Sequence, residues 1–236
     1  VSGALLTDRA TAADFSRTNL APGPDGLFGT DWLGRDMLSR TLAGLSLSIR
    51  IGALTACVSA VIALALGVAA ALSRWADAVL SWLIDLFLGI PHILLVMLIS
   101  LACGRGFLGV VAGVSLSHWP SLARLVREEV LQLRQAPYLL AAEKLGVPRG
   151  QLVRRHLLPH LLPQFLTGLI LQFPHAILHE ASVTFLGFGL SPEQPAIGVI
   201  LSESMRYLTT GKWWLAMLPG LMLVLTVVLF DVAGNS

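Results

Sequence analysis

Residues 51–72 read IGALTACVSAVIALALGVAAAL, and no charged side chain interrupts them. A helix needs about 20 apolar residues to cross the hydrocarbon core of a bilayer. This stretch is therefore long enough to span a membrane. Four further stretches contain glycine, proline or a lone polar residue, which membrane helices tolerate where neighbours shield the freed backbone groups: residues 79–103, 107–122, 157–178 and 213–230. We expect an all-α, polytopic transmembrane helix bundle with five spans.

The composition independently indicates a membrane protein. Hydrophobic residues make up 55% of the 236 residues, charged residues only 13%, and the mean hydropathy is +0.76. A soluble domain carries about 25% charged residues. The net charge of +2 is too small to indicate nucleic acid as a partner, so lipid is the expected environment. Cys57 and Cys103 lie in apolar stretches, where cysteine acts as a small hydrophobic residue.

A basic segment, YLLAAEKLGVPRGQLVRRHLLPHLLP at residues 138–163, separates the third and fourth of these later stretches from the earlier ones. Its pattern predicts two short helices joined by a turn. Ala141 and Ala142 are small enough to let another protein approach the first helix closely, and Gly146 ends that helix before a Val-Pro pair. A bulky residue at Gly146 is expected to crowd the helix and its turn. The segment therefore predicts a docking surface on a membrane protein.

The excess of lysine and arginine in this segment sets the expected orientation. By the positive-inside rule the segment is cytoplasmic. Counting spans from it places three other loops: residues 74–77 in the cytoplasm, and residues 104–106 and 190–212 outside. Residues 1–40 also fall outside, and Thr30 or Asp31 is expected to cap a helix on the outer membrane surface. An external N-terminal region needs a preceding segment to carry it across, so we expect a further transmembrane helix upstream.

The spacing of small residues in the basic segment resembles a known family. Two alanines, three further residues, a glycine and then Leu-Pro about a dozen positions later are found here at Ala141, Ala142, Gly146, Leu158 and Pro159. This spacing is similar to the coupling loop of binding-protein-dependent ABC importer permeases, which docks on the ATPase subunit. That family commonly has glutamate before the two alanines, where this chain has Leu140. A contact made by that carboxylate is therefore not carried over.

Other motifs extend the resemblance along almost the whole chain. The pattern G-T-D-x-L-G-R-D-x-x-S-R at residues 29–40 is similar to the signature of one branch, the dipeptide, oligopeptide and nickel importers. Further matches fall in the family's order: Asp85 with Ile90-Pro91, Trp119 with Ala123-Arg124, Glu180-Ala181-Ser182 with Phe185-Leu186-Gly187, and Pro219-Gly220. The chain most resembles the second of the two permeases. It departs at Ser46 and Ile197, where relatives often have arginine and tryptophan.

The resemblance implies a transport subunit and not an enzyme. In such importers two related permeases pair in the membrane, two ATPase subunits hold them from the cytoplasm, and an external binding protein delivers the solute. ATP and magnesium belong to the ATPase subunits, and the chain itself is expected to bind no cofactor; it has no G-x-x-x-x-G-K-[ST] motif. The implied location is the cytoplasmic (inner) membrane of a bacterium or archaeon, as a multi-pass protein.

The same resemblance implies a division of the chain. Residues 1–29 are expected to form an external N-terminal segment and linker, and residues 30–236 a transmembrane permease domain. The coupling loop occupies about residues 135–160 of that domain. The family's tail after its last span is expected to lie beyond residue 236.

Two histidines are candidate solute contacts. His175 and His179 are four residues apart and share one helical face, so they can offer two imidazoles to a metal ion. The alternative is that both form hydrogen bonds within the bundle, as is also expected of His118. With residues 116–119, LSHW, the pair resembles the nickel importers more than the peptide importers. The solute is thus left open between nickel or a metal chelate and di- or oligopeptides.

Two other functions compete with transport. A membrane metalloenzyme would use His175, His179 and Glu180, although this order differs from the H-E-x-x-H of metalloproteases. A membrane scaffold without transport activity is the other. The remaining charged residue within a span, Asp85, is expected to pair with a basic residue, because an unpaired charge is costly in a membrane.

Overall fold

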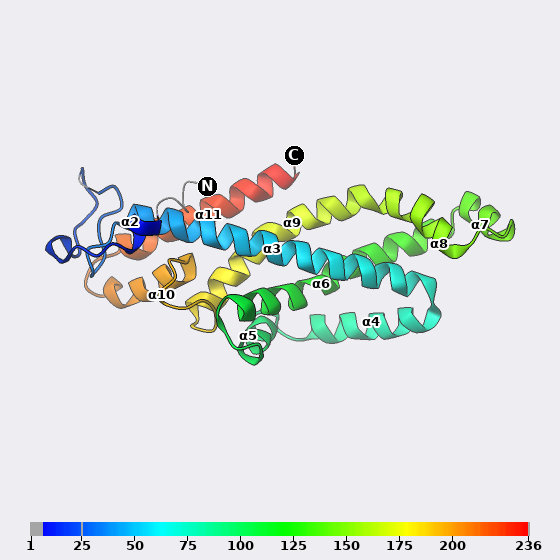
Figure 1. The fold of residues 1–236 in the computed structure, drawn as a ribbon, viewed down its shortest axis with the longest axis horizontal. Helices are drawn as coiled ribbons and strands as arrows, with labels where there is room; N and C mark the ends of the chain where they lie inside the picture. The colour runs from blue at the N-terminus through cyan, green and yellow to red at the C-terminus, as the bar shows by residue number, and fades with distance from the viewer. Residues whose placement is uncertain (1–6, 25, 236) are drawn as a thin grey trace.

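The computed structural model describes residues 7–24 and 26–235, which fold as a bundle of helices (Figure 1). In chain order these are α2 (Thr7–Thr11), the 3-10 turn η1 (Phe15–Arg17), α3 (Met37–Leu72), α4 (Arg74–Gly89), α5 (His92–Ala102), α6 (Gly106–Leu133), α7 (Pro137–Lys144), α8 (Arg149–Leu152), the π turn η2 (Val153–Leu157), α9 (Leu158–Phe185), α10 (Ile197–Leu208) and α11 (Trp214–Asn235). The only β-type pairings among the described residues are two isolated bridges near the N-terminus. The expected all-α class is confirmed.

In the part of the chain that the structure describes, three helices are long and apolar enough to cross a membrane, and they cover Met37–Ala70, Gly150–Phe185 and Trp214–Gly234. A fourth span results if α4 and α5 are counted together, but these helices are bent by 100° at the break between them. The expected span at residues 79–103 is therefore broken into two helices. Pro91 explains the break, because proline lacks an N–H and pushes the residue before it out of the helical region. Ile90 has extended backbone angles, with φ −90° and ψ 135°.

Helix α6 includes the remaining expected span, residues 107–122, and continues to Leu133. It does not reach the hydropathy of the other three, because Ser117, His118 and Pro120 interrupt its apolar run. It is nevertheless the central helix of the bundle, packed against α3, α4, α5 and α9. Small residues of α3 allow this close approach, since a Cβ added at Gly67 would lie 2.7 Å from Val126 of α6.

Ion pairs join α4 to α6 along one side of the bundle. Arg124 contacts Asp85 at 2.7 Å, and both side chains are substantially exposed. Arg127 forms a second pair with Asp77 near the start of α4. The expectation that Asp85 pairs with a basic residue is thus confirmed. Large apolar side chains such as Trp75 and Trp82 of α4 point outward, as suits a surface that faces lipid or another membrane protein.

The start of α3 differs from the expectation. The helix begins at Met37, and Asp36 is its N-cap, whose carboxylate accepts a hydrogen bond from the Ser39 amide at 2.7 Å. Residues 30–36 instead form turns that pack on the preceding segment. Backbone hydrogen bonds join Asp14 to Leu33, Asn19 to Asp31, and Leu20 to Thr30. A helix beginning at Thr30 or Asp31 is therefore not formed.

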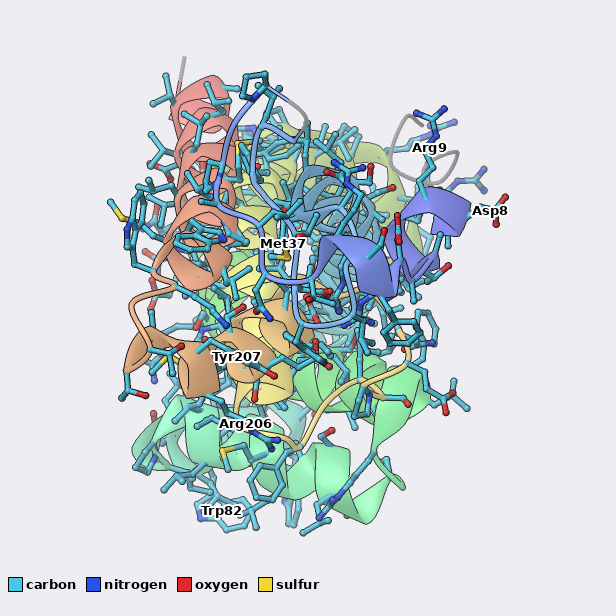
Figure 2. The ribbon with its side chains drawn as sticks, turned by 90° about the vertical axis from the view of Figure 1, so that its left-hand side faces the viewer. Asp8, Arg9, Met37, Trp82, Arg206 and Tyr207 are labelled. Carbon is cyan, nitrogen blue, oxygen red and sulfur yellow. The ribbon has the colours of Figure 1, made fainter. Side chains whose placement is uncertain are left out.

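Asp31 caps a turn and not a helix. Its Oδ1 accepts hydrogen bonds from the Leu33 and Arg35 amides at 2.9 and 3.0 Å, and its Oδ2 belongs to a buried ion network. Arg40, only 2% exposed, contacts the fully buried Asp31 at 2.7 Å and Glu203 of α10 at 3.0 Å. The ring of Trp32 stacks on Tyr207 of α10 with centroids 5.0 Å apart. Figure 2 views this end of the molecule, with Met37 in the interior and Tyr207 on α10 beneath the N-terminal segment. The network fastens residues 30–40 to α10.

The two ends of the bundle carry different elements. The N-terminal segment and α10 lie at one end, whereas α7 and α8 project from the opposite end (Figure 1). This arrangement places residues 138–163 and residues 190–212 at opposite ends of the long helices, as the expected orientation requires. A docking loop is therefore well separated from the segments expected outside.

Candidate functional site

The loop between α6 and α9 is anchored by leucines and leaves its outer face free. Leu139 of α7, Leu152 of α8 and Leu157 of the π turn are buried against α6. Their partners at the end of α6 are Val126, Val130 and Leu133. Burial of a leucine contributes about 1.5–3 kcal/mol relative to exposure. The two short helices are thus fixed on the end of the bundle.

Gly146 ends the first of these helices by adopting a left-handed backbone. Its φ is +82°, and α7 ends at Lys144, as the sequence predicts. The amides of Leu145 and Val147 donate to the carbonyls of Ala141 and Ala142 at 3.0 and 3.1 Å, which closes the last turn. No heavy atom lies within 4 Å of the position that a Cβ would take. A larger residue would therefore strain the backbone and would not crowd this chain.

The outer face of the loop combines small, apolar and basic residues. Ala141 is exposed, Ala142 is half-buried, and Leu140 and Leu145 are 45% and 84% exposed. The π turn adds three exposed polar side chains on the same protruding element: Arg154, Arg155 and His156. An exposed leucine beside small residues is the composition expected of a surface that another protein covers.

Leu158 and Pro159 lie apart from that face. They form the first turn of α9 and line a cavity of about 390 Å³ together with Leu64 and Phe165. The residues that match the family's spacing therefore occupy two places. Ala141, Ala142 and Gly146 belong to α7 and the turn after it, whereas Leu158 and Pro159 begin a long helix. Pro159 lies just after the π turn within the helical run Gly150–Phe185, where its missing N–H interrupts the regular hydrogen bonding.

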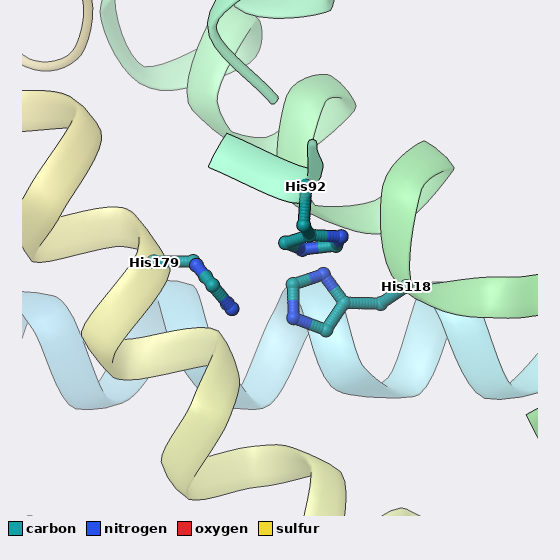
Figure 3. A group of neighbouring side chains, drawn as sticks. All are labelled: His92, His118 and His179. Carbon is teal, nitrogen blue, oxygen red and sulfur yellow. The ribbon is translucent and has the colours of Figure 1, made fainter. Parts of the chain in front are cut away.

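A second cluster lies within the bundle, where three histidines meet. His92 is the first residue of α5, His118 comes from the middle of α6, and His179 from α9. Their ring centroids are 4.4–5.0 Å apart, and one ligand atom from each ring lies within 4.8 Å of the others. Figure 3 shows the three rings facing one another. Imidazole nitrogens at such distances can bind a metal ion.

Hydrogen bonds define the tautomer of His118. Its Nδ1 lies 2.9 Å from the Val114 carbonyl oxygen, which can only accept, so Nδ1 carries the proton. The Nε2 atom then has a free lone pair, and it is buried without a hydrogen-bond partner. The expectation that His118 is hydrogen-bonded within the bundle is confirmed. The same contact leaves its other nitrogen available as a ligand.

The predicted pair His175 and His179 is only partly brought into this cluster. His175 is exposed and is not among the three rings at ligand distance. It lines the same cavity, of about 430 Å³, as His92, His118 and His179. The sequence analysis missed His92, although its position directly after Pro91 marks the break between α4 and α5. The structure thus replaces a two-histidine face by three histidines from three helices.

Glu180 lies apart from the histidines. It is fully buried, and its Oε1 accepts a hydrogen bond from the Thr184 hydroxyl at 3.0 Å. Among the described residues the group at ligand distance contains no carboxylate. A metalloenzyme site built from His175, His179 and Glu180 is therefore not assembled here.

Comparison with known proteins identifies the family. The family model described as binding-protein-dependent transport system inner membrane component matches residues 30–235. The chain belongs to this family. A Brucella suis protein provisionally named as a peptide transport system permease is 35% identical over 215 residues, which cover 91% of this chain and 72% of that protein. The dipeptide transport system permease protein DppC of Bacillus subtilis is 31% identical over 219 residues, covering 92% and 68%.

A solved structure supports the fold. A chain of the MetNI methionine ABC transporter in an inward-facing conformation matches with a TM-score of 0.67 and 20% identity, over 84% of this chain and 94% of that one. The bundle therefore has the fold of an ABC importer permease. The protein is a multi-pass inner-membrane permease subunit of an ABC importer, as the resemblance implied. Family membership implies an ATPase and a binding protein as partners in general.

Proposed function

We propose that this permease moves di- or oligopeptides through the inner membrane and that its α7–α8 loop receives the force of ATP hydrolysis. The observation that carries the proposal is the exposed face of α7 and its following turn, where Leu140, Ala141 and Leu145 are exposed at the end of the bundle opposite the N-terminal segment. The peptide solute rests on the names of the relatives in Brucella suis and Bacillus subtilis.

The same proposal assigns the partners. A second, related permease covers part of the apolar outer surface, and two ATPase subunits bind the α7–α8 loops of the pair from the cytoplasm. ATP and magnesium are held by those subunits, and this chain binds no cofactor of its own. An external binding protein delivers solute at the end formed by α10 and the N-terminal segment.

Movement of the ATPase subunits would reach the bundle through the coupling loop. Ala141, Ala142 and Gly146 shape the docking helix, and Leu158-Pro159 begins α9 directly beyond the π turn. Leu139 and Leu152 hold the loop on the end of α6, so the loop and two long helices move together. The resulting change between outward and inward access is a rigid-body transition.

A second solute class, nickel or another metal as a chelate, is favoured by one observation, the meeting of His92, His118 and His179 beside a cavity. His175 and His179, proposed here as contacts along the solute path, line that cavity. The two solute classes share the same permease and the same coupling loop. Direct measurement of the solute separates them.

The test uses the complete importer in proteoliposomes. ATP-driven uptake of labelled dipeptide, compared with labelled nickel, identifies the solute. In the same preparation Leu140→Ala should weaken ATPase docking by about 1 kcal/mol, or roughly fivefold, because about half of this side chain remains to be buried. Leu108→Ala, an exposed leucine on α6 outside the loop, is the matched control. Equal affinity of the two variants for the ATPase subunit would show that this subunit does not bind at Leu140.

A further inference from the structure

We propose that His92, His118 and His179 form a binding site for a divalent first-row transition-metal ion, carried as cargo through the bundle. The binding itself depends only on the three side chains, and its role as cargo rests on the second solute class of the proposed function, a metal ion or its chelate. All three donors come from different helices, α5, α6 and α9, so the site exists only in the folded bundle.

The donor atoms are available for coordination. The Nε2 atoms of His92 and His118 are both buried and lack a hydrogen-bond partner. For His118 the Val114 carbonyl holds the proton on Nδ1, which is the outer hydrogen bond that metal-binding histidines commonly make. Buried polar atoms without partners are costly, and a bound cation would satisfy both.

The distances require little adjustment. One nitrogen from each ring lies within 4.8 Å of the other two. Nitrogen ligands about 2.0–2.1 Å from a tetrahedral ion are roughly 3.4 Å apart, so a closure of about 1.4 Å at the longest edge suffices. Rotation of the three side chains about their χ angles would bring the nitrogens closer together.

The coordination shell has an open position. The three rings border a cavity of about 430 Å³, which is also lined by Gln172 and His175. The Gln172 Nε2 donates to Ser59 at 2.9 Å, while its Oε1 is buried and unpartnered. Three protein ligands with a free fourth position are typical of sites that exchange ligands, and not of closed structural sites.

The ligand types select the ion and limit its residence. Imidazole nitrogens suit nickel, cobalt, copper and zinc, whereas calcium and magnesium require oxygen ligands. No carboxylate belongs to the group among the described residues, so the charge of the ion is not neutralised by the protein. A charge is costly within a membrane span, and this favours release. An exchangeable site of this kind suits cargo in transit.

The position of His92 connects the site to the shape of the bundle. This residue follows directly on Pro91, at the point where α4 and α5 are bent by 100°. A change in that bend, or movement of α9 relative to α6, would separate the three nitrogens. The site is therefore expected to bind its ion in one conformation of the importer and to lose it in another.

The experiment measures metal binding on the assembled importer in lipid nanodiscs, without ATP and purified with a tag that contains no histidine. The complex is stripped with chelator and titrated by equilibrium dialysis with Ni²⁺, Co²⁺ and Ca²⁺, and the visible absorption of bound Co²⁺ reports nitrogen coordination. We expect one Ni²⁺ or Co²⁺ ion per copy of this chain and no Ca²⁺. His92→Gln and His179→Gln should each weaken binding at least tenfold, since loss of even an outer partner costs about 10–100-fold.

Controls use the other histidines of the chain. His160 is exposed at the start of α9, outside the docking face, so His160→Gln should leave binding unchanged. Absence of Ni²⁺ and Co²⁺ binding in the unmodified importer would overturn the proposal and leave an edge-to-face packed aromatic cluster. Binding lost in His175→Gln but kept in His92→Gln would overturn it in favour of a site on α9 alone. Peptide uptake and ATPase stimulation, measured separately, report on the proposed function.

Discussion

Replacement of Gly146 by a series of residues separates backbone strain from crowding at the docking surface. The φ of Gly146 is +82°, and the space where a Cβ would lie is open. Within this chain, therefore, the size of the new side chain costs nothing. A left-handed backbone costs an ordinary L residue about 1–2 kcal/mol. Asparagine tolerates this conformation better, and β-branched valine tolerates it worst.

The expected loss of ATPase affinity follows from these costs. If the docking face requires α7 to end at Gly146, the strain is subtracted from the binding free energy. Gly146→Ala should weaken docking by roughly 5–30-fold, which corresponds to 1–2 kcal/mol. Gly146→Val should weaken docking more than Gly146→Ala does. The affinity of Gly146→Asn for the ATPase subunit should remain within about threefold of that of the unmodified protein.

The assay titrates the ATPase subunit against the permease complex in nanodiscs and follows solute-stimulated ATP hydrolysis in the same samples. Gel filtration of each variant verifies that the complex is intact. Asparagine and valine are similar in bulk but differ in their tolerance of positive φ. Equal losses in these two variants would refute the strain argument and would show that the ATPase subunit itself crowds the position.

Two further substitutions test the packing of α10. Arg40→Met should lower the free energy of unfolding by about 3 kcal/mol, because it leaves Asp31 buried with a weakened ion pair. Arg124→Met removes an exposed ion pair and should lower it by less than about 1 kcal/mol, so similar melting temperatures for the two variants would contradict this. Gly198→Ala should lower the free energy of unfolding by about 1–3 kcal/mol, since its Cβ would lie 2.4 Å from a carbonyl oxygen of α9. Gly220→Ala would meet only a side chain at 3.7 Å and should be neutral or stabilising, so a lower melting temperature for Gly220→Ala than for Gly198→Ala would count against this packing.

Local sequence signals were sufficient for much of the fold. The charge-free run at residues 51–72 lies within α3, and the apolar run at residues 213–230 lies almost wholly within α11. The glycine at position 146 ends α7 because a left-handed residue after the last turn is a property of the local chain. Each of these features depends on neighbouring residues alone, which is why the sequence predicts them.

Features that depend on distant residues were missed or misplaced. Asp31 looks like a helix cap, but it is held by Arg40, which in turn reaches Glu203, 163 positions away. Proline at position 91 was compatible with a tolerated irregularity within one span, and only the packing of α5 against α6 and α9 shows a bend of 100°. The pair His175 and His179 was visible as a helical face. Its partners on α5 and α6 could not be predicted, because no local pattern brings three helices together.

The helical run from Gly150 to Phe185 begins within the coupling loop, so a tilt of the loop would act on this run as on a lever. At a rise of 1.5 Å per residue, residue 179 lies about 44 Å from residue 150, so a tilt of 5° would displace it by about 4 Å if the helix were rigid. Such a displacement is nearly as large as the separation of the histidine ring centroids, 4.4–5.0 Å. The π turn, Pro163 and Pro174 interrupt the regular hydrogen bonding along this lever. The bending stiffness at these three points therefore determines what fraction of a displacement imposed on the coupling loop is transmitted to the histidine-lined cavity.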